Sequence, residues 1–323
     1  MKTLRKVLVC LLLCLGIFVS TGCGEKSGVV VGILQTATHS ALDDSKDGFI
    51  EALKANGYEN AEFVVRNPEG DQTTMNSMAT ELVRKSDIVL GIGTPAAVAL
   101  QSARDAEEID VVILFTAVTD PVDSGLMEDA NKPTDITGTN DMNPVADQVD
   151  LIIELTNGIK KLGILYNVAE PNSLVQAEMV KAQAAKKGIE VVVKTVAEAV
   201  EISAATAALI QNDGAEAIYL PTDNLIASNM PAVASVADEM GVPTVCGESG
   251  MVAAGGTITY SISYKALGVL TGEMAAKILK GTPCSDVPST SVNESGLEVA
   301  INEKSIEALK IEVPQSIKDK LSK

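Results

Sequence analysis

The sequence has 323 residues, of which 46% are hydrophobic but only 3% are aromatic, with no tryptophan and one histidine. Lysine and arginine number 25 against 43 aspartates and glutamates, a formal net charge of −18. A field of this sign repels nucleic acid phosphates and anionic headgroups, so the composition excludes a nucleic acid partner. A histidine-based catalytic triad would have to use His39, the one histidine.

The N-terminus has the layout of a secretory signal peptide. Three basic residues lie within residues 2–6, an uncharged apolar run covers 7–19, and small residues 20–22 follow. Because this run is too short to span a bilayer comfortably, we expect residues 1–22 to be cleaved. Cys23 then stands where the bacterial lipobox places its acylated cysteine, although Ser20 replaces the usual leucine. We expect residues 23–28 to be a lipidated cysteine with a flexible tether that anchors the protein to the membrane; an ordinary signal peptide is the alternative.

Short apolar runs and amphipathic stretches alternate from residue 29 onward. The first series predicts strands at 29–35, 61–67, 87–93 and 110–116 and helices at 40–56, 71–85 and 94–106. A second series predicts helix 143–155, strand 161–167, helix 172–187, strand 190–196, helix 201–212, strand 217–223, helix 227–240 and strand 243–248. After it we expect helix 264–280, strand 297–301 and a short last helix.

Two consecutive series of this kind predict an α/β fold of two doubly wound parallel-sheet lobes joined by a multi-strand hinge. Three segments are expected to cross between the lobes, at 133–141, 257–263 and 283–288. The N-terminal lobe would comprise residues 29–140 and 262–283. The C-terminal lobe would comprise residues 141–261 and 284–323.

Ligands of open α/β sheets bind beyond the carboxyl ends of the strands, so the strand-to-helix loops of both lobes predict a cleft site. Free N–H groups at helix N-termini near Ser40, Thr94-Pro95 and Asn172-Ser173 suit a ligand carboxylate. A ligand ammonium would need a carboxylate from Asp120, Asp141, Glu170 or Asp223. Each of these residues can equally be an ordinary helix cap or turn former.

The sequence carries few signs of catalysis. Cys246 and Cys284 lack metal-ligand spacing, and we expect each to be a small buried hydrophobe, with a disulfide between them as the alternative. The run Gly91-Ile92-Gly93 imitates a dinucleotide fingerprint, but it follows the third strand and lacks the acidic partner. We therefore expect no enzyme, no cofactor and no metal.

Several blocks together resemble a known family. They are Gly32-Ile33-Leu34-Gln35, Ala41-Leu42-Asp43 with Gly48-Phe49, Gly70-Asp71-Gln72, Gly93-Thr94-Pro95-Ala96-Ala97, Phe115-Thr116-Ala117-Val118-Thr119-Asp120-Pro121, Gly163-Ile164-Leu165-Tyr166-Asn167 and Pro221-Thr222-Asp223-Asn224. Over residues 29–301 the sequence resembles the ABC transporter substrate-binding family of the tryptophan- and tyrosine-type importer lipoproteins. The Phe115–Pro121 and Pro221–Asn224 blocks are the most specific.

The resemblance implies a type I periplasmic-binding fold that closes like a hinge over an amino acid, often an aromatic one. It implies an extracytoplasmic lipoprotein, expected to be a monomer, that delivers its ligand to an ABC permease and ATPase. The candidate ligand-binding residues are Gln35, Ser40, Thr94, Pro95, Thr116, Ala117, Asp120, Asp141, Tyr166, Asn167, Glu170, Asn172, Ser173, Asp223, Asn224 and Glu248.

Two alternatives stay open. With so few rings, of which Phe115, Tyr166, Tyr260 and Tyr264 are the candidates for stacking, the ligand could be a branched or smaller amino acid or another small polar solute. The protein could also be a ligand-sensing receptor domain for a membrane signalling partner.

Overall fold

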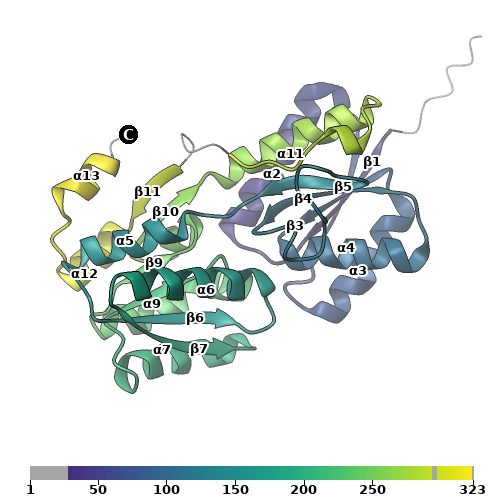
Figure 1. The fold of residues 1–323 in the computed structure, drawn as a ribbon. Helices are drawn as coiled ribbons and strands as arrows, with labels where there is room; N and C mark the ends of the chain where they lie inside the picture. Colours follow the sequence, from purple (N-terminus) through teal and green to yellow (C-terminus); the bar gives the residue numbers. More distant parts are fainter. Residues whose placement is uncertain (1–27, 293–296, 322–323) are drawn as a thin grey trace, which may run out of the picture.

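The computed structural model describes residues 28–292 and 297–321. These residues form two α/β lobes, one drawn mainly in purple and blue and the other mainly in teal and green (Figure 1). The predicted signal peptide, Cys23 and all but the last residue of the tether lie outside the described residues.

The first lobe is built on a five-stranded sheet in the order β2-β1-β3-β4-β5, with every neighbouring pair parallel. Helices cover both of its faces, so β3 is buried at all five positions. Its strands are β1 (Val30–Gln35), β2 (Glu62–Arg66), β3 (Ile88–Ile92), β4 (Val112–Val118) and β5 (Ile136–Asn140).

Two helices pack on each face of the first sheet. Helices α2 (Ser40–Leu53) and α11 (Tyr264–Leu279) bury Phe49 and Leu267 on one face. Helices α3 (Gln72–Lys85) and α4 (Thr94–Glu107) bury Met75 and Leu100 on the other. Helix α2 continues into the short π-helix η1 (Lys54–Tyr58), where Gly57 has a φ of 103°.

The second lobe has a six-stranded sheet in the order β11-β10-β9-β8-β6-β7, parallel except for the β10–β11 pair. Its strands are β6 (Lys161–Asn167), β7 (Glu190–Val196), β8 (Ala217–Leu220), β9 (Thr244–Cys246), β10 (Ile258–Ile262) and β11 (Leu297–Ile301).

Helices also cover both faces of this sheet. One face packs against α5 (Val145–Leu155), α6 (Pro171–Lys186) and α13 (Gln315–Leu321). The other packs against α7 (Ile202–Gln211), α8 (Asn224–Ser228), α9 (Met230–Glu239) and α10 (Ser249–Ala253). The remaining elements are α12 (Glu303–Leu309), η2 (Ala199–Glu201) and η3 (Cys284–Asp286).

Two segments expected as crossings between the lobes each consist largely of a regular strand. Residues 136–140 form β5 at the edge of the first sheet, and residues 258–262 form β10 in the second. Both contain threonine, whose hydroxyl bonds to neighbouring backbone. Thr137 Oγ1 donates to the Val287 carbonyl at 2.6 Å, and Thr259 Oγ1 donates to the Cys246 carbonyl at 2.6 Å. The chain therefore crosses between the lobes just outside these strands.

The segment after α11 stays with the first lobe as far as Thr290. Val287 belongs to the first-lobe core. The Thr290 N–H donates to the Gly138 carbonyl at 3.1 Å, and the Asn140 N–H donates to the Thr290 carbonyl at 2.9 Å. We therefore propose that the last connection begins after Thr290, whereas the sequence places the lobe boundary at residue 284.

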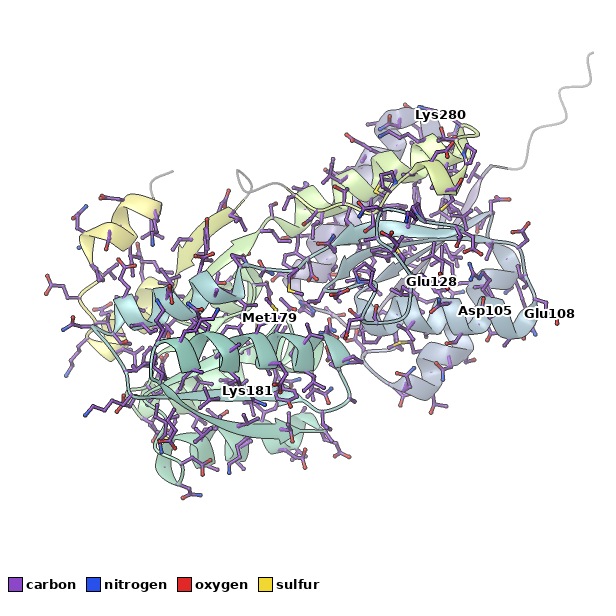
Figure 2. All side chains as sticks on the ribbon, viewed as in Figure 1. Asp105, Glu108, Glu128, Met179, Lys181 and Lys280 are labelled. Atoms are coloured by element: carbon purple, nitrogen blue, oxygen red, sulfur yellow. The ribbon has the colours of Figure 1, made fainter. Side chains whose placement is uncertain are left out.

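The molecular surface is strongly acidic, as at the first lobe, where Asp105, Glu108 and Glu128 are exposed (Figure 2). In residues 28–292 and 297–321, no helix has the length and apolar character needed to cross a bilayer. The same residues contain no cluster of three or more His, Cys, Asp or Glu side chains placed to hold a metal. Cys246 and Cys284 are buried free thiols.

Candidate functional site

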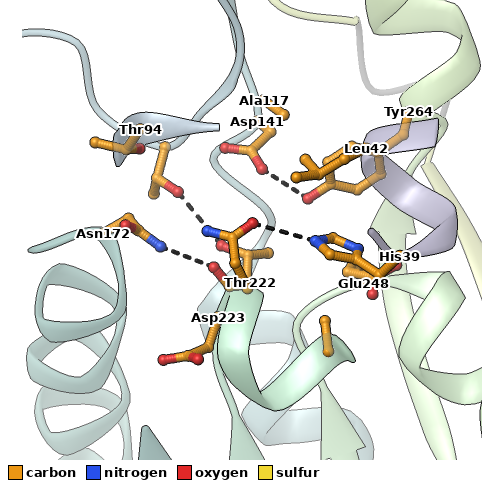
Figure 3. Close-up of a pocket in the computed structure, with 13 residues that line it drawn as sticks. His39, Leu42, Thr94, Ala117, Asp141, Asn172, Thr222, Asp223, Glu248 and Tyr264 are labelled. Carbon is orange, nitrogen blue, oxygen red and sulfur yellow. Dashed lines mark hydrogen bonds between the residues drawn. The ribbon is translucent and has the colours of Figure 1, made fainter. Parts of the chain in front are cut away.

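The strand-to-helix loops of the two sheets meet around a small enclosed cavity (Figure 3). Its volume is about 20 Å³, little more than the roughly 10–15 Å³ that one buried water needs. The side chains of the two lobes therefore touch across most of the cleft. The cavity is lined by His39, Leu42, Thr94, Ala117, Thr119, Asp141, Asn172, Thr222, Asp223, Asn224, Ala227, Glu248 and Tyr264.

The first lobe presents two helix N-termini to this cavity. Helix α2 begins after His39 and helix α4 begins after Gly93, and neither preceding residue caps its helix with a side chain. Gly93 has a φ of 89°, a conformation that favours glycine, and an added Cβ would lie 2.6 Å from Thr36 Oγ1. At α4, Pro95 has no N–H and the Ala96 N–H donates to Thr36 Oγ1 at 3.3 Å. The free first-turn N–H groups of α2, together with the positive ends of the two helix dipoles, suit a ligand carboxylate.

A buried carboxylate lies where the chain leaves the first lobe. Asp141 is 3% exposed, and one of its oxygens accepts a hydrogen bond from the Tyr264 hydroxyl at 2.6 Å (Figure 3). Burial raises the pKa of Asp141. Ala117, near the end of β4, also lines the cavity and has a φ of 55°, so a non-glycine residue is held in the left-handed region where the pairing of β4 with β5 is irregular.

The second lobe supplies a pair of buried carboxylates, Asp223 and Glu170. Asp223 accepts from the Asn167 N–H at 2.6 Å, the Ser173 hydroxyl at 2.8 Å and the Ile226 N–H at 2.9 Å. Glu170 lies behind the cavity wall and holds Asn224 and Asn172 in place. Burial raises the pKa of both carboxyls, and the charge of Asp223 raises that of Glu170 further.

Glu248 caps the short helix α10 at the edge of the cavity. Its carboxylate accepts from the Met251 N–H at 2.9 Å and from the Gly250 N–H. Burial raises the pKa of Glu248 to about 7. The cavity thus has three acidic lining residues, and among the described residues that line it there is no lysine or arginine.

Direct hydrogen bonds join the two lobes across the cleft. His39 Nε2 lies 3.1 Å from Asn224 Oδ1, and the Thr119 and Thr222 hydroxyl oxygens are 3.3 Å apart. Farther out, the Ser228 hydroxyl donates to the Thr38 carbonyl at 3.2 Å. These contacts show that the lobes are closed on each other.

Three polar atoms of the lining residues are buried without a hydrogen-bond partner. They are His39 Nδ1, Asp141 Oδ1 and Asn172 Oδ1. Buried polar atoms are normally paired, so unpaired ones in a cleft are positioned for a ligand. The Asn172 amide oxygen can only accept hydrogen bonds, and so can the Asp141 oxygen while its carboxyl group is ionised. Two acceptors of this kind suit a ligand rich in N–H donors.

Seven of the residues proposed from the sequence line the cavity: Thr94, Ala117, Asp141, Asn172, Asp223, Asn224 and Glu248. Four others support these residues. Glu170, Asn167 and Ser173 hold Asn224 or Asp223 through the bonds described above. Pro95 lies in the first turn of α4.

The other five proposed residues make contacts away from the lining. Gln35 binds the Ala37 carbonyl and Asp43, and Thr116 pairs with Thr139. Asp120 accepts from the Val122 and Asp123 N–H groups of its own loop. Ser40 is exposed at the start of α2. Tyr166 packs in the second-lobe core.

Sequence reasoning omitted six lining residues from the proposed site: His39, Leu42, Thr119, Thr222, Ala227 and Tyr264. Thr119 and Thr222 stand inside the two most specific sequence blocks, which was an available signal. Tyr264 is the one ring of the four stacking candidates that reaches the cavity, because Phe115 is buried in the first-lobe core and Tyr260 packs against the second.

Comparisons with known proteins agree with this architecture. Residues 30–322 match the model of a family described as ABC transporter substrate binding protein. A tyrosine-binding protein of Clostridioides difficile (strain R20291) is 35% identical over 315 residues, which are 91% of this chain and 89% of the relative. Two solute-binding proteins that are 17% and 10% identical, each with a TM-score of 0.61, share the fold alone and confirm the predicted type I periplasmic-binding architecture.

Two solved structures also bear on the closed cleft. A domain from Streptococcus pneumonia in complex with L-Trp is 34% identical, covers 91% of this chain and 98% of its own, and has a TM-score of 0.85. A ligand-free, open substrate-binding protein from Clostridium difficile is 36% identical, covers 88% and 96%, and has a TM-score of 0.66. Their identities to this chain are nearly equal, but the TM-score is higher for the ligand complex. The whole chain is therefore more similar to the ligand complex than to the open, ligand-free structure.

The predicted function class is therefore confirmed on sequence, fold and the closure of two lobes over a polar cavity. The relatives compared are binding proteins, and nothing in their descriptions is catalytic. This chain belongs to the ABC transporter substrate-binding protein family.

Proposed function

We propose that the protein captures a zwitterionic amino acid in the interlobe cleft and presents it to an ABC importer. The observation that carries this proposal is the polarity of the cavity. The N-termini of α2 and α4 face it from the first lobe, while unpaired acceptors of Asp141 and Asn172 and the carboxylates of Asp223 and Glu248 line it. The first set suits an α-carboxylate and the second suits an α-ammonium.

An aromatic side chain is the favoured ligand class. A relative 35% identical is a tyrosine-binding protein, and a structure 34% identical holds L-Trp. Leu42, Ala117, Ala227 and Tyr264 give the cavity an apolar wall against which a ring can pack. Because the closed cavity is so small, the lobes have to separate to admit any amino acid.

The cellular setting belongs to the same proposal. We place the protein outside the cytoplasm as a monomer, held to the membrane through acylated Cys23 after removal of residues 1–22. Its partners are an ABC permease and ATPase, as the family description implies. We propose no catalytic activity and no cofactor for the cleft. The alternative function is that of a receptor domain whose closed form is recognised by a membrane signalling partner. Genes for a permease and an ATPase beside the gene of this protein would argue against this alternative.

Titration calorimetry and thermal unfolding with L-tyrosine, L-tryptophan, L-leucine, glycine and myo-inositol test the ligand class. Ligand at about a hundred times its dissociation constant stabilises a fold by roughly 2.7 kcal/mol, which produces a clear rise in unfolding temperature. We expect this rise with an aromatic amino acid. Binding of leucine or glycine alone would replace the aromatic assignment, and binding of myo-inositol alone would overturn the amino acid assignment.

A further inference from the structure

The side chain of His39 bonds to the opposite lobe through one ring nitrogen and leaves the other for the cavity. Nε2 lies 3.1 Å from Asn224 Oδ1, and Nδ1 is buried without a partner. His39 stands directly before α2 and lines the cavity together with Leu42 from the first turn of that helix. Figure 3 shows the ring beside Leu42 and Glu248, facing the loops of the second lobe.

Glu170 determines which ring nitrogen of His39 carries the proton. Its carboxylate accepts from the Asn224 side-chain nitrogen at 2.7 Å and from the Asn224 backbone N–H at 3.0 Å. The amide nitrogen of Asn224 therefore faces Glu170, and the amide oxygen faces His39. An amide oxygen only accepts hydrogen bonds, so His39 Nε2 is the donor and carries the proton.

His39 is also neutral in the closed cleft. Burial lowers the pKa of His39 from its ordinary value, although the hydrogen bond that His39 makes to Asn224 Oδ1 and the charges of Asp43 and Glu69 act to raise it. A neutral ring protonated on Nε2 has a lone pair on Nδ1. The cavity therefore contains a neutral, buried acceptor in a position fixed by Glu170 and Asn224.

The charged and neutral acceptors of the cavity suit different parts of an amino acid. An ammonium is held best by a carboxylate, and Asp141 has an unpaired oxygen for it. A neutral imidazole nitrogen suits a neutral donor, and the side chains of tyrosine and tryptophan each carry one on an aromatic ring. Phenylalanine carries none.

Resting on the proposed amino acid function, we propose that His39 Nδ1 accepts a hydrogen bond from the phenol O–H or indole N–H of the ligand. His39 is thereby a specificity-determining residue that favours donor-bearing aromatic amino acids over phenylalanine. Phenylalanine would leave Nδ1 buried and unpaired, which corresponds to an affinity about 5- to 150-fold lower.

The test measures dissociation constants for L-tyrosine, L-tryptophan and L-phenylalanine by calorimetry on the wild-type protein and on His39→Gln. Glutamine provides an N–H for Asn224 but no atom equivalent to Nδ1. We expect the wild type to prefer tyrosine over phenylalanine by about 5- to 150-fold. In His39→Gln this ratio should fall to about one, through weaker tyrosine binding. Lys181→Gln, on the outer surface of α6, is the control and should keep the wild-type ratio.

Equal wild-type affinities for tyrosine and phenylalanine, or an unchanged preference in His39→Gln, overturn the role of His39 but leave the proposed function standing. Failure of all three amino acids to bind overturns both. Because the sequence has one histidine, ¹⁵N-histidine NMR of the tyrosine-saturated wild type reports this ring alone. An Nε2-protonated neutral ring whose Nδ1 resonance moves on binding supports the proposal. An imidazolium, an Nδ1-protonated ring or an unmoved Nδ1 resonance contradicts it.

Discussion

At the scale of single residues, the unpaired oxygen of Asp141 is the strongest candidate partner for a ligand ammonium. Replacing Asp141 with asparagine keeps an acceptor for the Tyr264 hydroxyl but removes the negative charge. A hydrogen bond to a charged group contributes about 1.5–3 kcal/mol, so we expect Asp141→Asn to weaken amino acid binding by about tenfold or more. Titration calorimetry measures this loss.

The same substitution should leave the ligand-free fold at least as stable as the wild type. Burial raises the pKa of Asp141, which means that ionised Asp141 is costly in the closed protein. Thermal unfolding without ligand checks this expectation, and the exposed Asp110→Asn serves as the control for both measurements. Unchanged affinity in Asp141→Asn would show that the ammonium binds elsewhere.

His39 predicts a pH dependence of closure with a definite sign. Closing the cleft buries the ring and lowers its pKa, so the closed state binds fewer protons than the open state. Above the ordinary histidine pKa of about 6.5, neutral His39 therefore makes its full contribution to ligand affinity. Below that pH, the affinity falls by up to tenfold per pH unit, because a proton has to leave the ring before the cleft can close. The charges that face the ring or share its cavity are those of Asp43, Glu69, Asp141, Asp223 and Glu248.

Calorimetry of L-tyrosine binding between pH 8 and pH 5.5 measures this effect. Buried carboxyls with raised pKa act in the opposite direction, because closing lets them take up protons. They are present in both proteins, so the wild-type affinity divided by that of His39→Gln isolates the histidine. We expect this ratio to fall below pH 6.5. A ratio independent of pH would mean that His39 does not change its environment on closure.

Sequence reasoning found site residues by their place at strand ends, and it failed where contacts cross the cleft. Asp141, Asp223 and Asn224 follow strands or precede helices, so their convergence could be inferred from the topology of parallel sheets. The role of His39 depends on a partner 185 positions away, which no local pattern encodes. Tyr166 illustrates the opposite error, since it lies next to the last residue of β6 but its ring lies in the core.

At the scale of elements, the close packing of α2 against α11 depends on glycine. A Cβ on Gly268 would lie 2.0 Å from the Ser45 carbonyl oxygen, and one on Gly48 would lie 2.3 Å from the Lys265 carbonyl oxygen. Because both obstacles are backbone, no side chain can rotate to make room. Overpacking of this kind costs about 1–3 kcal/mol, so we expect Gly268→Ala to lower the free energy of unfolding by that amount.

Urea unfolding of the ligand-free protein measures the effect of Gly268→Ala. Glu273→Ala lies on the exposed side of α11 and should stay within about 0.5 kcal/mol of the wild type. If Gly268→Ala were as stable as this control, the two helices would have to separate without cost, and their close approach would not contribute to stability.

The predicted elements show why some strands can be predicted from a sequence and others cannot. Strands β6, β7 and β11 have the bounds that the sequence predicts, because a run of Val, Ile and Leu between helix signals has one simple interpretation. Strand β5 reads Ile-Thr-Gly-Thr-Asn and satisfies its buried hydroxyls through distant partners, with Thr139 bonded to Thr116 at 3.0 Å and to Thr271 at 2.8 Å. Such pairing exists only once the sheet has formed, so the segment resembled a polar linker.

At the scale of the whole molecule, ligand entry requires the two lobes to move apart, because the closed cavity has a volume of only about 20 Å³. Thr119 and Thr222 offer a direct test of this movement. Their hydroxyl oxygens are 3.3 Å apart across the cleft, close enough for two cysteines at these positions to be candidates for a disulfide. The described native thiols, Cys246 and Cys284, are buried and so compete little for oxidation.

We expect Thr119→Cys/Thr222→Cys to bind L-tyrosine when reduced and to take up almost none when oxidised without ligand. Oxidation in the presence of ligand should instead retain it through dialysis until a reductant is added. Both outcomes follow because the crosslink prevents the hinge from opening. The single variant Thr119→Cys cannot form this crosslink, so oxidation should neither block its uptake of tyrosine nor trap tyrosine that is already bound. Rapid uptake of tyrosine by the fully oxidised double variant would mean that the ligand reaches its site without separation of the lobes. The contacts between His39 and Asn224 would then be a fixed interface between lobes instead of one that forms on closure.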